Sequence, residues 1–342
     1  MNRTKRVAVA AAFAVLGCTA WAQPLPVGNY FQQFFLPRTR LAMHSGRIVN
    51  TSGWHMGNTT MSSPVGAGEE KEQVTLRSGG FAGNTGSIEY QRTNAQEEFT
   101  VEVNSEGAVR FRRTPKGNAA IQAMQFTQLP GEAITFVLGP EGKQQVCRAP
   151  TLWHLLLFFP DECRPLVSVL EQLRRDWQIG RLAAAVEAEL LKAAGGARPN
   201  REHWAALVQQ LGDDQFMKRE AAERQLRAIG APLLGYLHQL DLNKLDAEQA
   251  SRVRRVIKSL SRQTTDDTPE QVAAWLAEDP QVWLALLSRP DEAARRTAAR
   301  QLASLLGEDV GVDPAADPAT QKDQREALRV RIERSKPAAK KR

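Results

Sequence analysis

Apolar and polar residues alternate along much of the first half of the chain, which is the pattern of half-buried strands. Val101 and Val103 lie on one face of such a segment, and after the turn residues at 104–107 the same alternation returns with Val109 and Phe111. This pattern predicts a β-hairpin. Similar alternation predicts further strands at 41–49, 74–77, 88–92, 124–129, 134–138 and 144–147.

From Thr151 onward the apolar spacing changes to that of helices. Thr151 is expected to cap a short helix that stops before Pro160, and Asp161 to cap a second helix with Pro165 in its first turn. A third helix is expected from about Arg181 until two consecutive glycines at 195–196. The fold class is therefore α+β, with a mostly antiparallel β-sandwich or open barrel followed by an all-α region.

An internal repeat lies in the helical part. The pattern Arg219-x2-Ala222-x-Arg224-Gln225-Leu226 recurs 76 positions later as Arg295-x2-Ala298-x-Arg300-Gln301-Leu302. This offset equals two units of about 38 residues, close to the length of helical-hairpin repeats.

The first copy continues through Ile229, Gly230 and Pro232 to Leu237, and this stretch resembles a HEAT-type repeat. The resemblance covers about residues 200–307 and implies a helical surface that binds other proteins. Its motif consists of packing residues, so no catalytic residue is carried over. The second copy lacks a proline-led helix directly after Gly307, so we expect the array to end there. The alternative is that these helices only complete a globular α-domain.

The first 22 residues have the composition of a bacterial secretory signal peptide. A basic start precedes an apolar run at 7–17, and Ala20 and Ala22 offer small residues for cleavage before Gln23. A lipidated Cys18 is the alternative. We expect the protein to be periplasmic or secreted, and no later apolar stretch is long enough to span a membrane.

These features predict six segments. They are a signal peptide (1–22), a lead-in rich in proline and aromatic residues that packs on the next domain (23–37), a β-rich domain (38–149), a helical connector (150–197), a HEAT-like domain (198–310) and a basic tail (311–342).

Charge is unevenly distributed along the chain. The net charge is +7, but residues 321–342 hold nine Lys or Arg against three Asp or Glu, and three further basic residues lie in the leader. A nucleic-acid-binding domain carries its basic patch on the fold itself, so we expect no nucleic-acid partner. The tail is either a solvated charge run or a peripheral contact for anionic envelope polymers.

Cleavage of the leader leaves two cysteines, Cys147 and Cys163. In an oxidising compartment this pair favours a disulfide that would fix the β-rich domain against the helices. Two buried thiols are one alternative. A metal site with His154 is another, although the spacing matches no common zinc pattern and His154 is better explained as a core histidine.

No catalytic motif is present in the sequence: neither the His-Glu-x2-His, the Gly-x-Ser-x-Gly nor the phosphate-loop pattern occurs. We therefore expect no catalytic, cofactor or metal site. The glycine-rich stretch at 51–86 is either a variable loop or a ligand loop, and Trp54 and His55 are its candidate ligand residues.

The sequence thus predicts an exported, non-enzymatic binding or scaffold protein that has a protein partner. The alternative is an envelope enzyme or ligand-binding protein with its site on the β-rich domain near the 51–86 loop.

Overall fold

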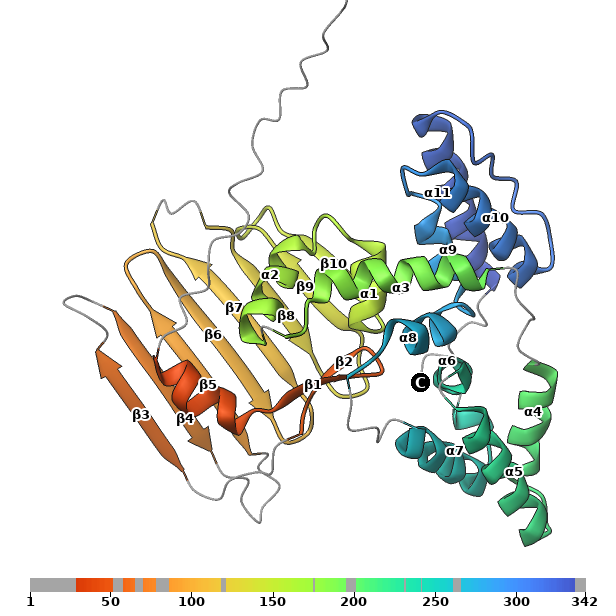
Figure 1. Cartoon of the computed structure of the whole chain (residues 1–342), viewed down its shortest axis with the longest axis horizontal. Helices are drawn as coiled ribbons and strands as arrows, with labels where there is room; N and C mark the ends of the chain where they lie inside the picture. Colours follow the sequence, from red (N-terminus) through yellow and green to blue (C-terminus); the bar gives the residue numbers. More distant parts are fainter. Residues whose placement is uncertain are drawn as a thin grey trace, which may run out of the picture.

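The computed structural model describes residues 29–51, 58–64, 70–77, 86–117, 121–174, 176–194, 201–230, 232–240, 242–260 and 266–335. These residues form an antiparallel β region followed by a mostly helical region (Figure 1). The predicted α+β class is therefore confirmed.

Eight strands form one open antiparallel sheet in the order β10-β9-β8-β7-β6-β5-β4-β3, so that neighbours in the chain are neighbours in space. The strands are β3 (Thr59–Pro64), β4 (Lys71–Arg77), β5 (Ser87–Thr93), β6 (Glu97–Asn104), β7 (Val109–Pro115), β8 (Met124–Gln128), β9 (Ile134–Leu138) and β10 (Gln145–Ala149). The predicted hairpin is β6–β7, with Val101 opposite Phe111. Strand β3, which is rich in Ser and Thr, was missed because it has little apolar alternation.

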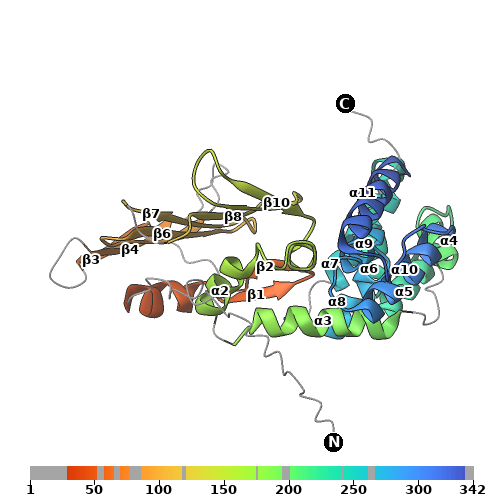
Figure 2. The ribbon, with the colours of Figure 1, turned by 90° about the horizontal axis from the view of Figure 1, so that it is seen from above.

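One face of the sheet is covered and the other is open (Figure 2). The covered face carries the buried apolar residues of the alternating strands, such as Val101 and Phe111, while the neighbouring Thr100 and Arg112 lie on the open face. The cover consists of the short helices η1 (Phe31–Phe35) and η2 (Leu36–Arg38), the hairpin β1 (Leu41–His44) and β2 (Arg47–Asn50), and the first helices of the helical region. The second layer is therefore a hairpin with helices rather than a second large sheet.

The lead-in packs as predicted, over the part of it that the structure describes. Phe31 and Phe35 are fully buried, and both rings contact Tyr90 of β5.

The helices are α1 (Leu152–Phe158), α2 (Arg164–Leu173), α3 (Ile179–Ala193), α4 (Arg201–Gln210), α5 (Phe216–Ile229), α6 (Pro232–Gln239), η3 (Leu242–Lys244), α7 (Ala247–Leu260), α8 (Pro269–Leu276), α9 (Pro280–Leu286), α10 (Glu292–Leu306) and α11 (Pro318–Ser335). Thr151 caps α1 as predicted, because its side chain accepts a hydrogen bond from the backbone N–H of His154. The prediction that Asp161 caps α2 was wrong. Residues 160–163 form a turn, so the N-cap position of α2 is Cys163. Asp161 forms an ion pair with Arg164 instead.

The buried residues fall into two separate cores. The larger core is continuous from the lead-in through the sheet, α1–α3 and α8–α11. The smaller core belongs to α4–α7 and contains Trp204, Leu226, Leu233 and Val253 among its members. We call α4–α7 the helical unit; in Figure 1 it projects away from the sheet.

The C-terminal segment is less separate than the sequence suggested. The tail contains the charged helix α11, whose Leu328 and Ile332 are buried in the larger core and which packs on α9. A loop separates α10, which holds the second copy of the repeat, from α11, which begins at Pro318. The expectation that the repeat array ends near Gly307 stays a prediction.

Candidate functional site

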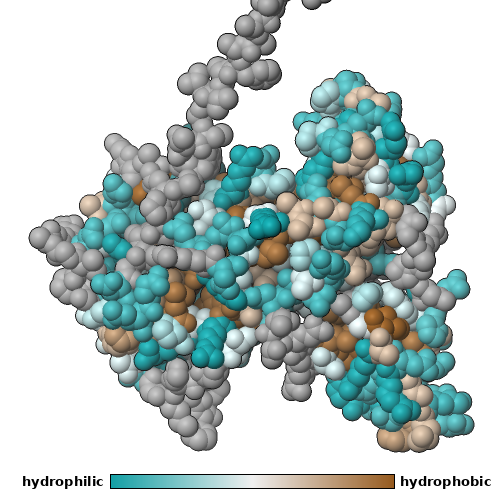
Figure 3. All heavy atoms as spheres, in the orientation of Figure 1, coloured by the Kyte–Doolittle hydropathy of each residue, from teal (hydrophilic) through white to brown (hydrophobic). Residues whose placement is uncertain are grey.

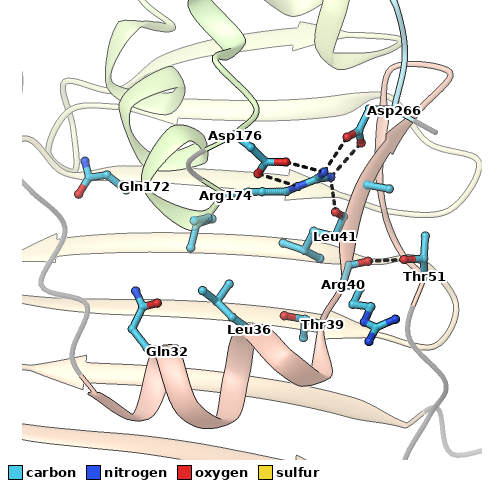
Figure 4. Close-up of a pocket in the computed structure, with 12 residues that line it drawn as sticks. Gln32, Leu36, Thr39, Arg40, Leu41, Thr51, Gln172, Arg174, Asp176 and Asp266 are labelled. Atoms are coloured by element: carbon cyan, nitrogen blue, oxygen red, sulfur yellow. Dashed lines mark hydrogen bonds and ion pairs between the residues drawn. The ribbon is translucent and has the colours of Figure 1, made fainter. Parts of the chain in front are cut away.

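A cleft opens on the covered side of the sheet, between η1–η2 on one wall and the C-terminal end of α2 on the other (Figure 4). Its volume is about 800 Å³, which lies in the range of small-molecule sites. Figure 3 shows apolar surface in this part of the molecule. The lining residues are Gln32, Leu36, Thr39, Arg40, Leu41, Ala42, Thr51, Gln172, Leu173, Arg174, Asp176 and Asp266.

Arg174 is the centre of the polar side of the cleft. Its Nε and Nη2 donate to the two oxygens of Asp176 at 3.1 and 2.9 Å, and Nη2 also lies 2.8 Å from Oδ2 of Asp266. Its Nη1 donates to Oδ1 of Asp266 at 3.0 Å and to the carbonyl of Leu41 at 2.6 Å. Although burial opposes it, hydrogen bonding to Asp176 and Asp266 raises the pKa of Arg174, and hydrogen bonding to Arg174 lowers the pKa of Asp176.

Asp266 and Asp267 attach the start of the α8–α11 segment to the β1–β2 hairpin. Oδ1 of Asp266 accepts a hydrogen bond from the backbone N–H of Met43 at 2.7 Å. The backbone N–H of Asp267 donates to the carbonyl of Met43 at 2.8 Å. The carboxylate of Asp267 accepts the backbone N–H groups of Ser45 and Gly46 at 2.7 and 2.6 Å. Two adjacent aspartates thus hold one side of the hairpin and its turn.

The turn itself requires unusual backbone geometry. Ser45 and Gly46 both have positive φ, at 50° and 69°. A Cβ at Gly46 would lie 2.7 Å from Thr151 and 2.9 Å from Trp153, so only glycine fits. The indole N–H of Trp153 donates to Asp267 at 2.7 Å. Burial raises the pKa of Asp267, so these three hydrogen bonds only partly offset the loss of its hydration.

His154 lies in the core as predicted and connects two helices. Its Nδ1 is 2.8 Å from the hydroxyl of Thr151, and its Nε2 is 3.2 Å from the carboxylate of Asp279, which caps α9. Both ring nitrogens therefore have protein partners. Within the described residues, no group of three or more His, Cys, Asp or Glu side chains has an arrangement that could hold a metal ion.

Cys147 and Cys163 are both fully buried, and in the structure they are free thiols rather than the expected disulfide. Burial raises the pKa of Cys147 to about 11. Burial also raises the pKa of Cys163, and the proximity of Cys147 raises it further. Cys147 lies on β10 and Cys163 lies at the start of α2.

The helical unit adjoins the rest of the molecule where α6 packs on α8 and where α4 forms an ion pair. Arg201 of α4 forms an ion pair with the buried Glu278, which follows α8. At the opposite end of the unit, Phe216 and Met217 of α5 are 56% and 69% exposed. Leu207 and Leu211 are buried in the smaller core, so their side chains form no part of an exposed binding surface.

Comparisons with known protein families, with curated proteins and with solved structures found no match. The site must therefore be interpreted from its own geometry. None of the helices in the described parts of the chain has the length and apolar character needed to cross a bilayer.

Several predicted positions lie outside the described residues. These are the cleavage site at Ala22 and Gln23, Cys18, and the candidate ligand residues Trp54 and His55. Thr51, the last described residue before that loop, lines the cleft. The glycine-rich stretch therefore starts at the rim of the cleft.

The sequence analysis missed Arg174, Asp176, Asp266 and Asp267. Arg174 and Asp266 are 92 residues apart, and no spacing rule joins them. The only local signal was the adjacent pair at 266–267, which resembles an ordinary polar segment before the helix cap at Thr268.

Proposed function

We propose that this chain is an exported, non-enzymatic binding or scaffold protein of the bacterial envelope, and that its helical unit docks onto another protein. The observation that carries the proposal is the adjacent pair Phe216 and Met217, exposed at the free end of the unit. Large apolar side chains exposed side by side on a projecting element are typical of protein-binding surfaces.

The position of the Phe216 ring supports a surface role. The guanidinium of Arg219, one turn further along α5, lies 5.7 Å from the ring centre. A cation over an aromatic face restrains the ring, so Phe216 is held at the surface instead of turning into the smaller core. A preordered aromatic side chain loses little conformational entropy when a partner binds it.

We further propose that the two motif copies are HEAT-like units. Ala222 and Leu226 of α5 are fully buried, and so are the equivalent Ala298 and Leu302 of α10. Each motif helix packs on the helix before it, α5 on α4 and α10 on α9. An array of only two units needs support from neighbouring structure. The larger core provides this support for the second copy.

The experiment is site-specific photo-crosslinking in the native cell envelope. A benzophenone amino acid replaces Met217, and a matched control places it at Ser251, an exposed polar position on α7 of the same unit. We expect one dominant protein adduct from position 217 and none from position 251. The adduct should disappear when Phe216 is changed to Asp, and the melting temperature should stay unchanged because the side chain is exposed.

Equal adducts from both positions, or an adduct that persists in Phe216→Asp, would remove the surface role of the α5 tip. The same outcome would leave α4–α7 as an additional folded element without a docking function.

A further inference from the structure

The cleft between η1–η2 and α2 has polar groups that the fold does not use. Among the described residues, the side chains of Gln32 and Arg40 form no hydrogen bond or ion pair, and both are exposed. A second hollow of about 800 Å³ on the other side of α2 differs in this respect. Its charged groups are engaged, since Arg164 pairs with Asp161 and Arg289 pairs with Glu187.

The two walls of the cleft carry opposite charge (Figure 4). Arg40, which follows η2, supplies on one wall a guanidinium that pairs with no described residue. The opposite wall carries Arg174 with two carboxylates, so it has one formal negative charge in excess. Asp176 is the accessible member of this group, with 69% of its side chain exposed.

The other residues that line the cleft further restrict the class of ligand that fits it. Leu36, Leu41, Ala42 and Leu173 supply an aliphatic surface between the two charged walls. None of the described lining residues is aromatic, so they offer a quaternary ammonium group none of the aromatic contacts that usually hold it. A primary ammonium instead donates hydrogen bonds, and carboxylate oxygens of the kind that Asp176 presents are strong acceptors.

We propose that this cleft binds a small zwitterion of the short-peptide class, whose carboxylate pairs with Arg40 and whose ammonium lies at Asp176. The aliphatic surface contacts the side chains of the ligand, and Gln32 offers an amide to its peptide group. A purely anionic ligand meets the excess negative charge at Asp176, and a purely cationic ligand meets Arg40. The proposal is independent of any partner at the helical unit.

The test is isothermal titration calorimetry of the full chain without its leader, with the dipeptide Leu-Leu as the first probe. The control ligands are N-acetyl-Leu-Leu, which lacks the ammonium, and Leu-Leu amide, which lacks the carboxylate. Dipeptides of Ala, Lys and Glu cover other side chains. We expect saturable binding of at least one dipeptide with one site per chain, and at least tenfold weaker binding of its two blocked forms.

Variants of the protein separate the two ends of the ligand. Arg40→Gln should weaken binding of the free dipeptide at least tenfold. It should leave the already weak binding of the amide form unchanged, because that form lacks the carboxylate that pairs with Arg40. Arg148→Gln, an exposed arginine on β10 at the sheet edge, removes the same charge away from the cleft and should change nothing. Arg40 has no partner within the described residues, so its variant should melt like the parent.

Three results would overturn the proposal. They are the absence of heat with every dipeptide, equal affinity for free and blocked forms, and an equal loss of affinity in Arg40→Gln and Arg148→Gln.

Discussion

Leu226 and Leu302 occupy equivalent positions in the two copies of the helical motif, and both are fully buried, yet they belong to different cores. Leu302 packs into the core that runs through the sheet and α1–α3. Among the described residues, Leu226 belongs to the core formed by α4–α7. The motif therefore determines which face of a helix is buried, while the surrounding elements determine how much structure depends on it.

This difference separates the roles of the two copies. The second copy is linked to the β region through the larger core and through the aspartates before α8. The first copy projects from the part of the molecule that contains the larger core, which we call the body. Its apolar pair, Phe216 and Met217, is 56% and 69% exposed. A unit with its own small core can open or dock without disturbing the cleft.

The largest expected loss of stability comes from truncating the equivalent buried leucine in each core. Leu226→Ala and Leu302→Ala should each destabilise their core by about 2–5 kcal/mol, because each leaves a cavity at a fully buried position. Limited proteolysis with mass spectrometry should show cleavage confined to α4–α7 in Leu226→Ala. In Leu302→Ala the sheet and α8–α11 should become cleavable together.

The controls for this pair are Arg224→Ala and Arg300→Ala, which are exposed neighbours at equivalent positions of the repeat. The free energy of unfolding of both variants should stay within about 0.5 kcal/mol of that of the parent protein. Cleavage spread over the whole chain in Leu226→Ala would show that the two cores act as one.

A disulfide between Cys147 and Cys163 should strengthen the body alone. The structure has two free thiols here, and we predict that they form the disulfide in an oxidising compartment, with a gain of about 3 kcal/mol in the chain-entropy account of a loop this short. Alkylation of the unfolded, unreduced protein followed by intact-mass measurement should find no modified cysteine. Two alkylated cysteines in protein taken from the envelope would contradict the prediction, and a reduced sample controls for the labelling.

The reduced protein should show the pH dependence that its buried thiols impose. An unfolded thiol ionises near pH 8.5, whereas burial raises the pKa of Cys147 to about 11. The folded state therefore keeps its proton between these values while the unfolded state releases it, and stability falls as the pH rises through this range. Urea unfolding from pH 8 to 10 should show this loss in the reduced form and not in the disulfide form.

Asp267→Ala should destabilise the body by about 2 kcal/mol, because it leaves the N–H groups of Ser45, Gly46 and Trp153 without their acceptor. Urea unfolding followed by tryptophan fluorescence measures this change. Asp214→Ala, at an exposed position before α5, is the control and should be close to neutral. A loss confined to α4–α7 would contradict the assignment of Asp267 to the body.

The smallest effect is expected where the two parts meet. Arg201→Ala removes the ion pair with Glu278 and should reduce stability by about 1 kcal/mol, since the arginine is partly exposed. Hydrogen exchange should become faster in the first turn of α4 and stay unchanged in the sheet. Unchanged exchange in α4 would mean that apolar contacts alone hold the unit in place.

Local patterns in the sequence predicted most of the strands and helices, because alternation and helical spacing are properties of adjacent residues. The β6–β7 hairpin and the Thr151 cap are examples. The division into two cores was not predictable, since Ala222 and Ala298 have the same local pattern. Which neighbours cover them depends on contacts between distant segments.

The cleft was hidden for the same reason. Arg174, Asp176 and Asp266 look like solvated charges in the sequence, and only the fold brings them onto one wall. The exposure of Phe216 and Met217 was also hidden, because two apolar residues at the start of a helix are usually buried. Spacing identifies the buried face of a helix more readily than the exposure of its first turn.

The most direct test of the two-core account is native-state hydrogen exchange of the unmodified chain at increasing urea concentrations. The account predicts that amides of α5 and α7 exchange through an opening of lower free energy than amides of α10 and β6, which should share one larger value. A single common opening free energy for all four elements would contradict it.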